Sequence, residues 1–110
     1  MESIINRIYE LLYLPITTPY NLLDNAKLEN YSYVKYYKHE EWFISEMECL
    51  CPDKKLHKFF YHFDLNDSLH HVVMETQGEM DIVFDRKTEL NKSINEYKKM
   101  KKENIINEAV

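Results

Sequence analysis

Residues 41–51 read EWFISEMECLC, and their alternating pattern is the clearest structural signal in the sequence. Successive side chains of a β-strand point to opposite faces, so this stretch predicts a strand with two distinct faces. One face carries Trp42, Ile44, Glu46 and Glu48, and the other carries Phe43, Ser45, Met47, Cys49 and Cys51. We expect the face with Met and Cys to point into the core.

Further strands are predicted on both sides of this stretch. Residues 31–37 are rich in Tyr, which favours a pleated surface, and a turn at residues 38–40 joins them to residues 41–51. Turn-forming residues at 52–54 and 66–68 separate a third strand at 55–64 and a fourth strand at 69–76. Residues 77–79 either bend the fourth strand or close a hairpin. We favour the hairpin, with a fifth strand at 80–84.

Helical spacing marks both ends of the chain. Residues 3–14 predict a helix, whose apolar positions are Ile4, Ile5, Ile8, Leu11 and Leu12. Residues 16–30 contain two prolines and predict a loop with a short helix near residues 20–28. A long final helix is predicted over residues 86–107, with a sparse apolar stripe formed by Leu90, Ile94, Tyr97, Ile105 and Ile106.

This order of elements predicts a single α+β domain over residues 1–110. It comprises an N-terminal helix, a four- to five-stranded, mostly antiparallel meander sheet and a long C-terminal helix. A length of 110 residues is typical of one domain, and the aromatic content of 14% supplies large side chains for a core. With a single glycine, Gly78, the chain contains no glycine-rich phosphate loop.

Several features indicate a cytoplasmic protein without membrane contact. No apolar run approaches the roughly 18 residues of a membrane span, and the N-terminus lacks the basic and apolar segments of a signal peptide. Cys49 and Cys51 share one strand face, where a strain-free disulfide seldom forms, so we expect two free thiols. The abundance of Asn, Lys, Ile, Tyr and Glu is typical of an AT-rich genome, such as that of a bacterium, a phage or another mobile element.

The charge is distributed unevenly along the chain. Residues 1–85 hold 15 acidic and 7 basic side chains, whereas residues 86–103 hold 7 basic and 3 acidic side chains. The lysines of residues 98–102 raise the hypothesis of contact with nucleic acid. We interpret them instead as a solvated helix end, because positive charge complements the dipole there and the acidic body repels phosphates. A nucleic-acid partner is not expected.

Cysteines and histidines on neighbouring strands raise a metal hypothesis. The weak candidate ligands are Cys49, Cys51, His62 and His71. Zinc requires four converging ligands, and these spacings lack the usual two-residue or three-residue separation within each pair. We therefore expect neither a metal nor another cofactor.

Catalytic residues are equally hard to assign. A cysteine nucleophile requires a histidine such as His57 or His62 beside it, but a cysteine inside a strand is usually a packing residue. The paired carboxylates of Glu46 and Glu48 are expected to be solvated on the outer side of the sheet. No stretch carries a family motif, so we expect that the protein is not an enzyme.

The number of aromatic residues suggests a binding surface. Rings occur on both faces of the first and third predicted strands, which is more than two helices cover. We predict a small non-enzymatic inhibitor, immunity protein or regulator that binds another macromolecule through an aromatic and acidic sheet surface. The expected contact residues are Tyr31, Tyr33, Trp42, Glu46, Glu48 and Tyr61.

Three alternatives remain open. In the first, the N-terminal loop with Tyr20, Leu22 and Leu23 covers one of these aromatic faces. In the second, the protein is a homodimeric structural module, in which the aromatic face or the final helix contacts a second copy. In the third, it is a small metal- or thiol-dependent protein that uses Cys49, Cys51 and nearby histidines.

Overall fold

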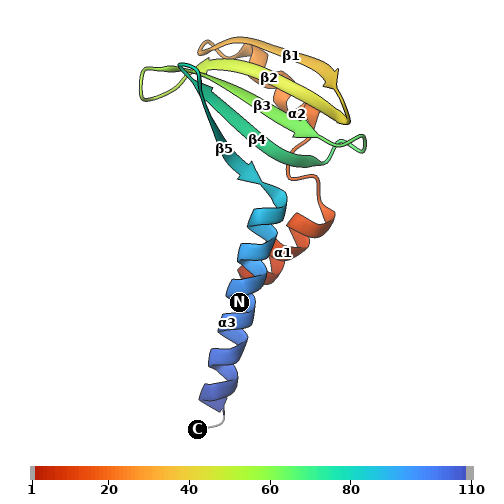
Figure 1. Ribbon diagram of the computed structural model, residues 1–110, viewed down its shortest axis with the longest axis vertical. Helices are drawn as coiled ribbons and strands as arrows, with labels where there is room; N and C mark the ends of the chain where they lie inside the picture. Colours follow the sequence, from red (N-terminus) through yellow and green to blue (C-terminus); the bar gives the residue numbers. More distant parts are fainter. Residues whose placement is uncertain (1, 109–110) are drawn as a thin grey trace. The chain divides into compact units, whose positions relative to one another are not determined.

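The computed structural model describes the backbone of residues 2–108 and the side chains of residues 3–103. The elements follow the order α1 (Glu2–Tyr13), α2 (Pro19–Leu23), the short 3-10 helix η1 (Asp24–Lys27), β1 (Tyr31–His39), β2 (Trp42–Leu50), β3 (Leu56–Phe63), β4 (Leu69–Thr76), β5 (Glu79–Asp85) and α3 (Arg86–Glu108) (Figure 1). The predicted α+β architecture is confirmed, including the separate fifth strand. Ile105 and Ile106, expected in the stripe of the last helix, lie outside the described side chains.

The described residues form two compact units. A helical unit comprises residues 2–14 and 86–108, and a sheet unit comprises residues 15–85. None of the described helices combines the length and apolar content of a membrane span.

The sheet is an antiparallel meander in the order β1-β2-β3-β4-β5. Each connection between strands contains a residue with positive φ: Glu40, Lys54, Asp67 and Gln77. This left-handed conformation reverses the chain within a few residues. The short connections therefore keep consecutive strands adjacent.

The core of the sheet unit lies on one face of the sheet, here called the inner face. Its buried cluster consists of Leu22, Met47, Phe63, Leu69 and Val72. Helix α2 starts at a capping box between Thr18 and Asn21, which satisfies two backbone amides and positions Leu22 against β2 and β3. Of the loop residues considered as a cover for an aromatic face, Leu22 packs on the inner face, whereas Tyr20 and Leu23 are exposed. No helix of residues 15–85 covers the opposite, outer face.

The helical unit is a pair of helices. Leu11 of α1 is fully buried, and the Arg86 guanidinium donates hydrogen bonds to the carbonyl oxygens of Leu11 (2.6 Å) and Leu14 (2.9 Å). Leu11 lies in the last turn of α1, where carbonyl oxygens lack partners within the helix, and Leu14 follows that turn. Arg86, at the start of α3, thereby holds the end of α1.

Candidate functional site

The outer face of the sheet carries three cross-strand rows of side chains. Strand pairing places Tyr37, Ile44, His62, His71 and Asp85 in the first row, Lys35, Glu46, Phe60, Val73 and Ile82 in the second, and Tyr33, Glu48, Lys58, Glu75 and Met80 in the third. Rings from β1 and β3 thus share one face with carboxylates from β2 and β4. Aromatic and acidic groups occupy the same surface.

Glu46 connects the rings of β1. Its carboxylate accepts hydrogen bonds from the hydroxyls of Tyr33 (2.6 Å) and Tyr37 (2.8 Å), and the Lys35 ammonium lies 3.5 Å from it. Glu46 is only 8% exposed, so the expectation of a solvated carboxylate was wrong. The reason is that Tyr33 and Tyr37 fold over Glu46 from the neighbouring strand.

Hydrogen bonding keeps Glu46 ionised despite its burial. Burial alone opposes the charge, but the two phenols and Lys35 more than offset it, and the pKa of Glu46 is lowered. Burial and the bond to Glu46 raise the pKa of Tyr37 to about 12, and that of Tyr33 is also raised. The Lys35 ammonium lies 5.5 Å and 5.9 Å from the centroids of these two rings. Both rings are therefore held in place by Glu46 and Lys35.

A β-bulge brings two consecutive histidines to the outer face. His62 pairs with His71 and Phe63 pairs with Leu69, which leaves His70 as the extra residue. The Nδ1 atoms of His70 and His71 lie 2.8 Å apart, and both rings contact Trp42 with centroid distances of 4.8 Å and 5.2 Å. The His62 ring stacks on His71 at 4.0 Å. We call these four residues the Trp–histidine patch.

Two histidines of the Trp–histidine patch, His62 and His71, have lowered pKa values. Burial, followed by the nearby His62 and His70, lowers the pKa of His71 to about 4. Burial also lowers the pKa of His62. Since the charged form of His62 and of His71 is disfavoured, these two rings present aromatic surface rather than positive charge.

The structure divides the six expected contact residues between the two faces. Tyr33, Trp42, Glu46 and Glu48 lie on the outer face. Tyr31 and Tyr61 pack against the core cluster on the inner face. For Tyr31, the cause is a shift in the β1–β2 register between Tyr31 and Tyr33, which breaks the simple alternation.

The candidate metal ligands form two pairs, the cysteines and the histidines, which lie on opposite faces of the sheet. The Sγ atoms of Cys49 and Cys51 lie 3.5 Å apart, and Cys49 is buried on the inner face, opposite His62 and His71. Burial and the neighbouring Cys51 thiol raise the pKa of Cys49 to about 11, which disfavours a thiolate. Among the residues with described side chains, no three His, Cys, Asp or Glu groups are placed to hold a metal ion.

His57 does not activate a cysteine but binds two other residues. Its Nε2 lies 2.7 Å from Asp53 Oδ2, and its Nδ1 bonds the Thr76 hydroxyl. An acid, an imidazole and a hydroxyl in this order also occur in hydrolases. The side chain of His57 is only 8% exposed, however, and both of its nitrogens are engaged. We therefore assign His57 to joining the β2–β3 connection to the end of β4.

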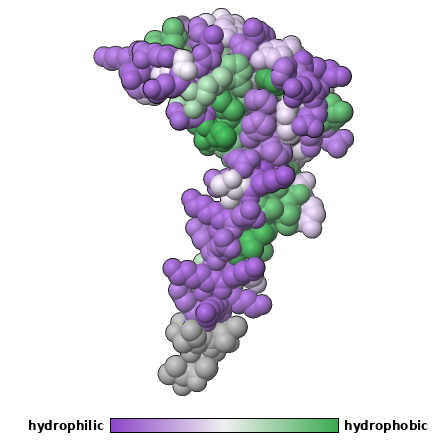
Figure 2. All heavy atoms as spheres, in the orientation of Figure 1, coloured by the Kyte–Doolittle hydropathy of each residue, from purple (hydrophilic) through white to green (hydrophobic). Residues whose placement is uncertain are grey.

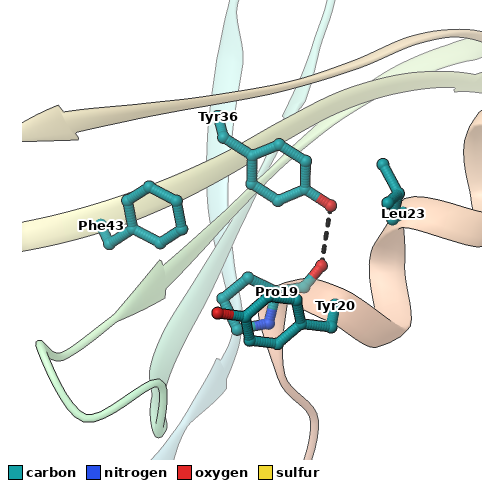
Figure 3. A pocket seen from close by; sticks show the side chains of 5 residues that line it. All are labelled: Pro19, Tyr20, Leu23, Tyr36 and Phe43. Carbon is teal, nitrogen blue, oxygen red and sulfur yellow. Dashed lines mark hydrogen bonds between the residues drawn. The ribbon is translucent and has the colours of Figure 1, made fainter.

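A separate pocket of about 360 Å³ opens on the inner face beside α2. Figure 3 shows its lining residues, Pro19, Tyr20, Leu23, Tyr36 and Phe43. The Tyr36 hydroxyl donates to the Pro19 carbonyl at 2.7 Å, and the Tyr36 and Phe43 rings stack 5.8 Å apart. The pocket is suited to an apolar group, with Tyr20 and Leu23 exposed at its rim.

Tyr37, Phe60 and His70 of the outer face were not among the contacts expected from the sequence. Tyr37 follows the same alternation as Tyr33 along β1, so this spacing was an available signal. His70 had no such signal, because consecutive residues of a regular strand point to opposite faces. Only the bulge places His70 beside His71.

No protein-family model matches the chain, and no curated protein or solved structure matches it. The assignment of the outer face as the candidate site therefore rests on the geometry of the chain itself.

Proposed function

We propose that this protein is a small, non-enzymatic binding protein whose outer sheet face contacts another protein. The observation that supports this proposal is the set of rings on that face, Tyr33, Tyr37, Trp42 and Phe60, over which no helix of residues 15–85 packs. Tyrosine and tryptophan dominate the energetics of protein interfaces, because each contributes a large contact area with few rotatable bonds.

Contacts within the outer face hold its rings in place, which lowers the cost of ordering them when a partner binds. Ordering a side chain at an interface costs about 0.5–1.5 kcal/mol. Tyr33 and Tyr37 are already held by Glu46, and Trp42 is already held by three histidine rings. This cost is therefore reduced for the rings that would contribute most to affinity.

The charge of the sheet unit favours a protein partner over nucleic acid. Residues 15–85 carry 13 acidic and 6 basic side chains. On the outer face, Lys58 stands between Glu48 and Glu75 in the third row, so its charge is balanced locally. A phosphate backbone would meet net negative charge at this surface.

An inhibitor, immunity protein or regulator of a bacterium, a phage or another mobile element fits this chemistry. We also propose that it acts in the cytoplasm. The free thiols of Cys49 and Cys51 are compatible with that location, which is reducing.

Photo-crosslinking in the native cells tests the proposed surface. Benzoylphenylalanine in place of Tyr33 on the outer face is expected to capture one defined protein upon irradiation. The same probe in place of Tyr20, at the rim of the inner pocket, is not. Trp42→Ala should lower the crosslinking yield at position 33 at least about tenfold, because truncating an interface hot spot costs more than 1.4 kcal/mol.

Leu23→Ala on the inner face is the matched control and should leave the yield unchanged. Circular dichroism verifies that both variants fold. Crosslinking at position 20 without crosslinking at position 33 would contradict the proposal and assign binding to the inner pocket.

A further inference from the structure

Helix α1 has more apolar surface than its partner helix covers. On the side facing α3, Leu11 is buried and Ile4 and Ile8 are half-buried. Next to them lies a groove of about 310 Å³, lined by Ile5, Ile8, Ile94 and Tyr97. Contact with α3 accounts for this side of α1.

A second apolar stripe runs along another side of α1. Its members are Ile5, Tyr9, Leu12 and Tyr13, which are 47–70% exposed. At about 100° per residue they span an arc of roughly 100°, the width of a face that packs on a neighbouring element. Figure 2 shows apolar surface along α1 beside the hydrophilic surface of α3. We call these four residues the α1 stripe.

We infer that the α1 stripe is the contact surface between two copies of this chain, packed with their α1 helices antiparallel across a two-fold axis. The proposal is independent of the outer sheet face. In a two-fold interface the same residues face each other from both copies. Ile5 belongs both to the α1 stripe and to the groove, so mutual docking of the stripes brings apolar residues of each copy towards the groove of the other.

The charges around α1 are compatible with this arrangement. Arg7 lies on the side of the helix opposite the α1 stripe, Glu10 lies outside the edge of the stripe, and the two form their own ion pair at 4.0 Å. Four of the six lysines of α3 lie in residues 98–102, in its C-terminal half. Because α3 starts where α1 ends, the two helices of a copy run in opposite directions. Antiparallel α1 helices therefore place the basic ends of the two α3 helices far apart.

The area of the α1 stripe fits a weak, reversible dimer. Side chains of this kind, about half exposed, present roughly 400 Å² per copy, somewhat less than the roughly 500 Å² per partner at which specific interfaces begin. The exposed Leu14 and the neighbouring groove add to it. A helix of 12 residues is marginal alone, and two packed helices bury only a small core, which a second copy would enlarge. Two copies make a four-helix bundle with one shared core.

Analytical ultracentrifugation of the full chain tests this inference. At concentrations from 1 to 200 µM, on the order of typical dimer affinities, the protein should sediment with twice the 13.4 kDa chain mass at the upper end. Leu12→Lys should raise the dissociation constant about 100-fold, because a lysine would be buried without a partner. Tyr13→Lys, at the most exposed position of the α1 stripe, should weaken the dimer as well.

Glu10→Lys is the matched control and should leave the dissociation constant within about threefold, since it adds the same side chain outside the α1 stripe. Circular dichroism and Trp42 emission report whether each variant is folded. A wild-type monomer at 200 µM overturns the inference, as does a dimer that Leu12→Lys and Tyr13→Lys leave intact. Neither result bears on binding by the outer sheet face, which the crosslinking experiment measures separately.

Discussion

At the scale of single residues, Glu46 supports the outer face through two hydrogen bonds. Glu46→Ala removes the acceptor for the hydroxyls of Tyr33 and Tyr37 and leaves both half-buried without it. Each orphaned hydroxyl costs about 1–3 kcal/mol, so we expect the free energy of unfolding to fall by about 3 kcal/mol. Urea denaturation followed by Trp42 emission measures the change. Glu48→Ala, on the same strand and face, should cost less than about 1 kcal/mol, and equal losses would contradict the role of Glu46.

His71 couples stability to pH at the same scale. Its pKa is about 4 in the folded protein and about 6.5 when unfolded, so the unfolded chain takes up the proton first as the pH falls. The contribution of neutral His71 to stability is complete above pH 6.5 and is lost progressively between pH 6.5 and pH 4. His71→Phe should therefore flatten the pH dependence of the free energy of unfolding in this window. Urea denaturation at each pH measures the free energy of unfolding. The same pH dependence in the wild-type protein and in His71→Phe would contradict the role of His71.

At the scale of elements, local patterns predicted the strands well and the bulges not at all. The alternation in residues 42–50 and the turn residues around β4 identified these strands, and the inward direction of Met47 and Cys49 is confirmed. The extra residue at His70 depends on how β3 and β4 pair, which no local pattern reports. Candidate contacts on β2 were therefore placed on the correct face, whereas Tyr31 and His70 required the observed registers.

The β4–β5 hairpin allows a prediction at this scale. Thr76 pairs with Glu79, and the two residues between them have positive φ, 52° for Gln77 and 88° for Gly78. Asparagine adopts this conformation more readily than glutamine, so Gln77→Asn should raise the free energy of unfolding by about 0.5 kcal/mol. Gly78→Ala should lower it by about 1 kcal/mol through backbone strain alone, because an added Cβ would have no atom within 4 Å. Thermal denaturation of both variants measures these changes. Destabilisation by Gln77→Asn together with stabilisation by Gly78→Ala would contradict the turn conformation.

At the scale of the whole molecule, the chain separates two kinds of surface. The sheet unit is acidic and rich in rings, whereas α3 carries 7 basic and 3 acidic side chains over residues 86–103. The proposed partner protein and the proposed second copy thus use surfaces of different units. Binding and self-association are expected to respond to different substitutions, and loss of one need not abolish the other.

Division into two units predicts that residues 15–85 fold by themselves. All members of the buried cluster, from Leu22 to Val72, belong to this segment of 71 residues, and domains of about 60 residues can fold alone. The isolated segment should unfold cooperatively in urea and keep the Trp42 emission of the full chain. Since it lacks the α1 stripe, it should also remain monomeric where the full chain dimerises. A segment that is unfolded at 25 °C would contradict this prediction, because its core would then require α1 or α3.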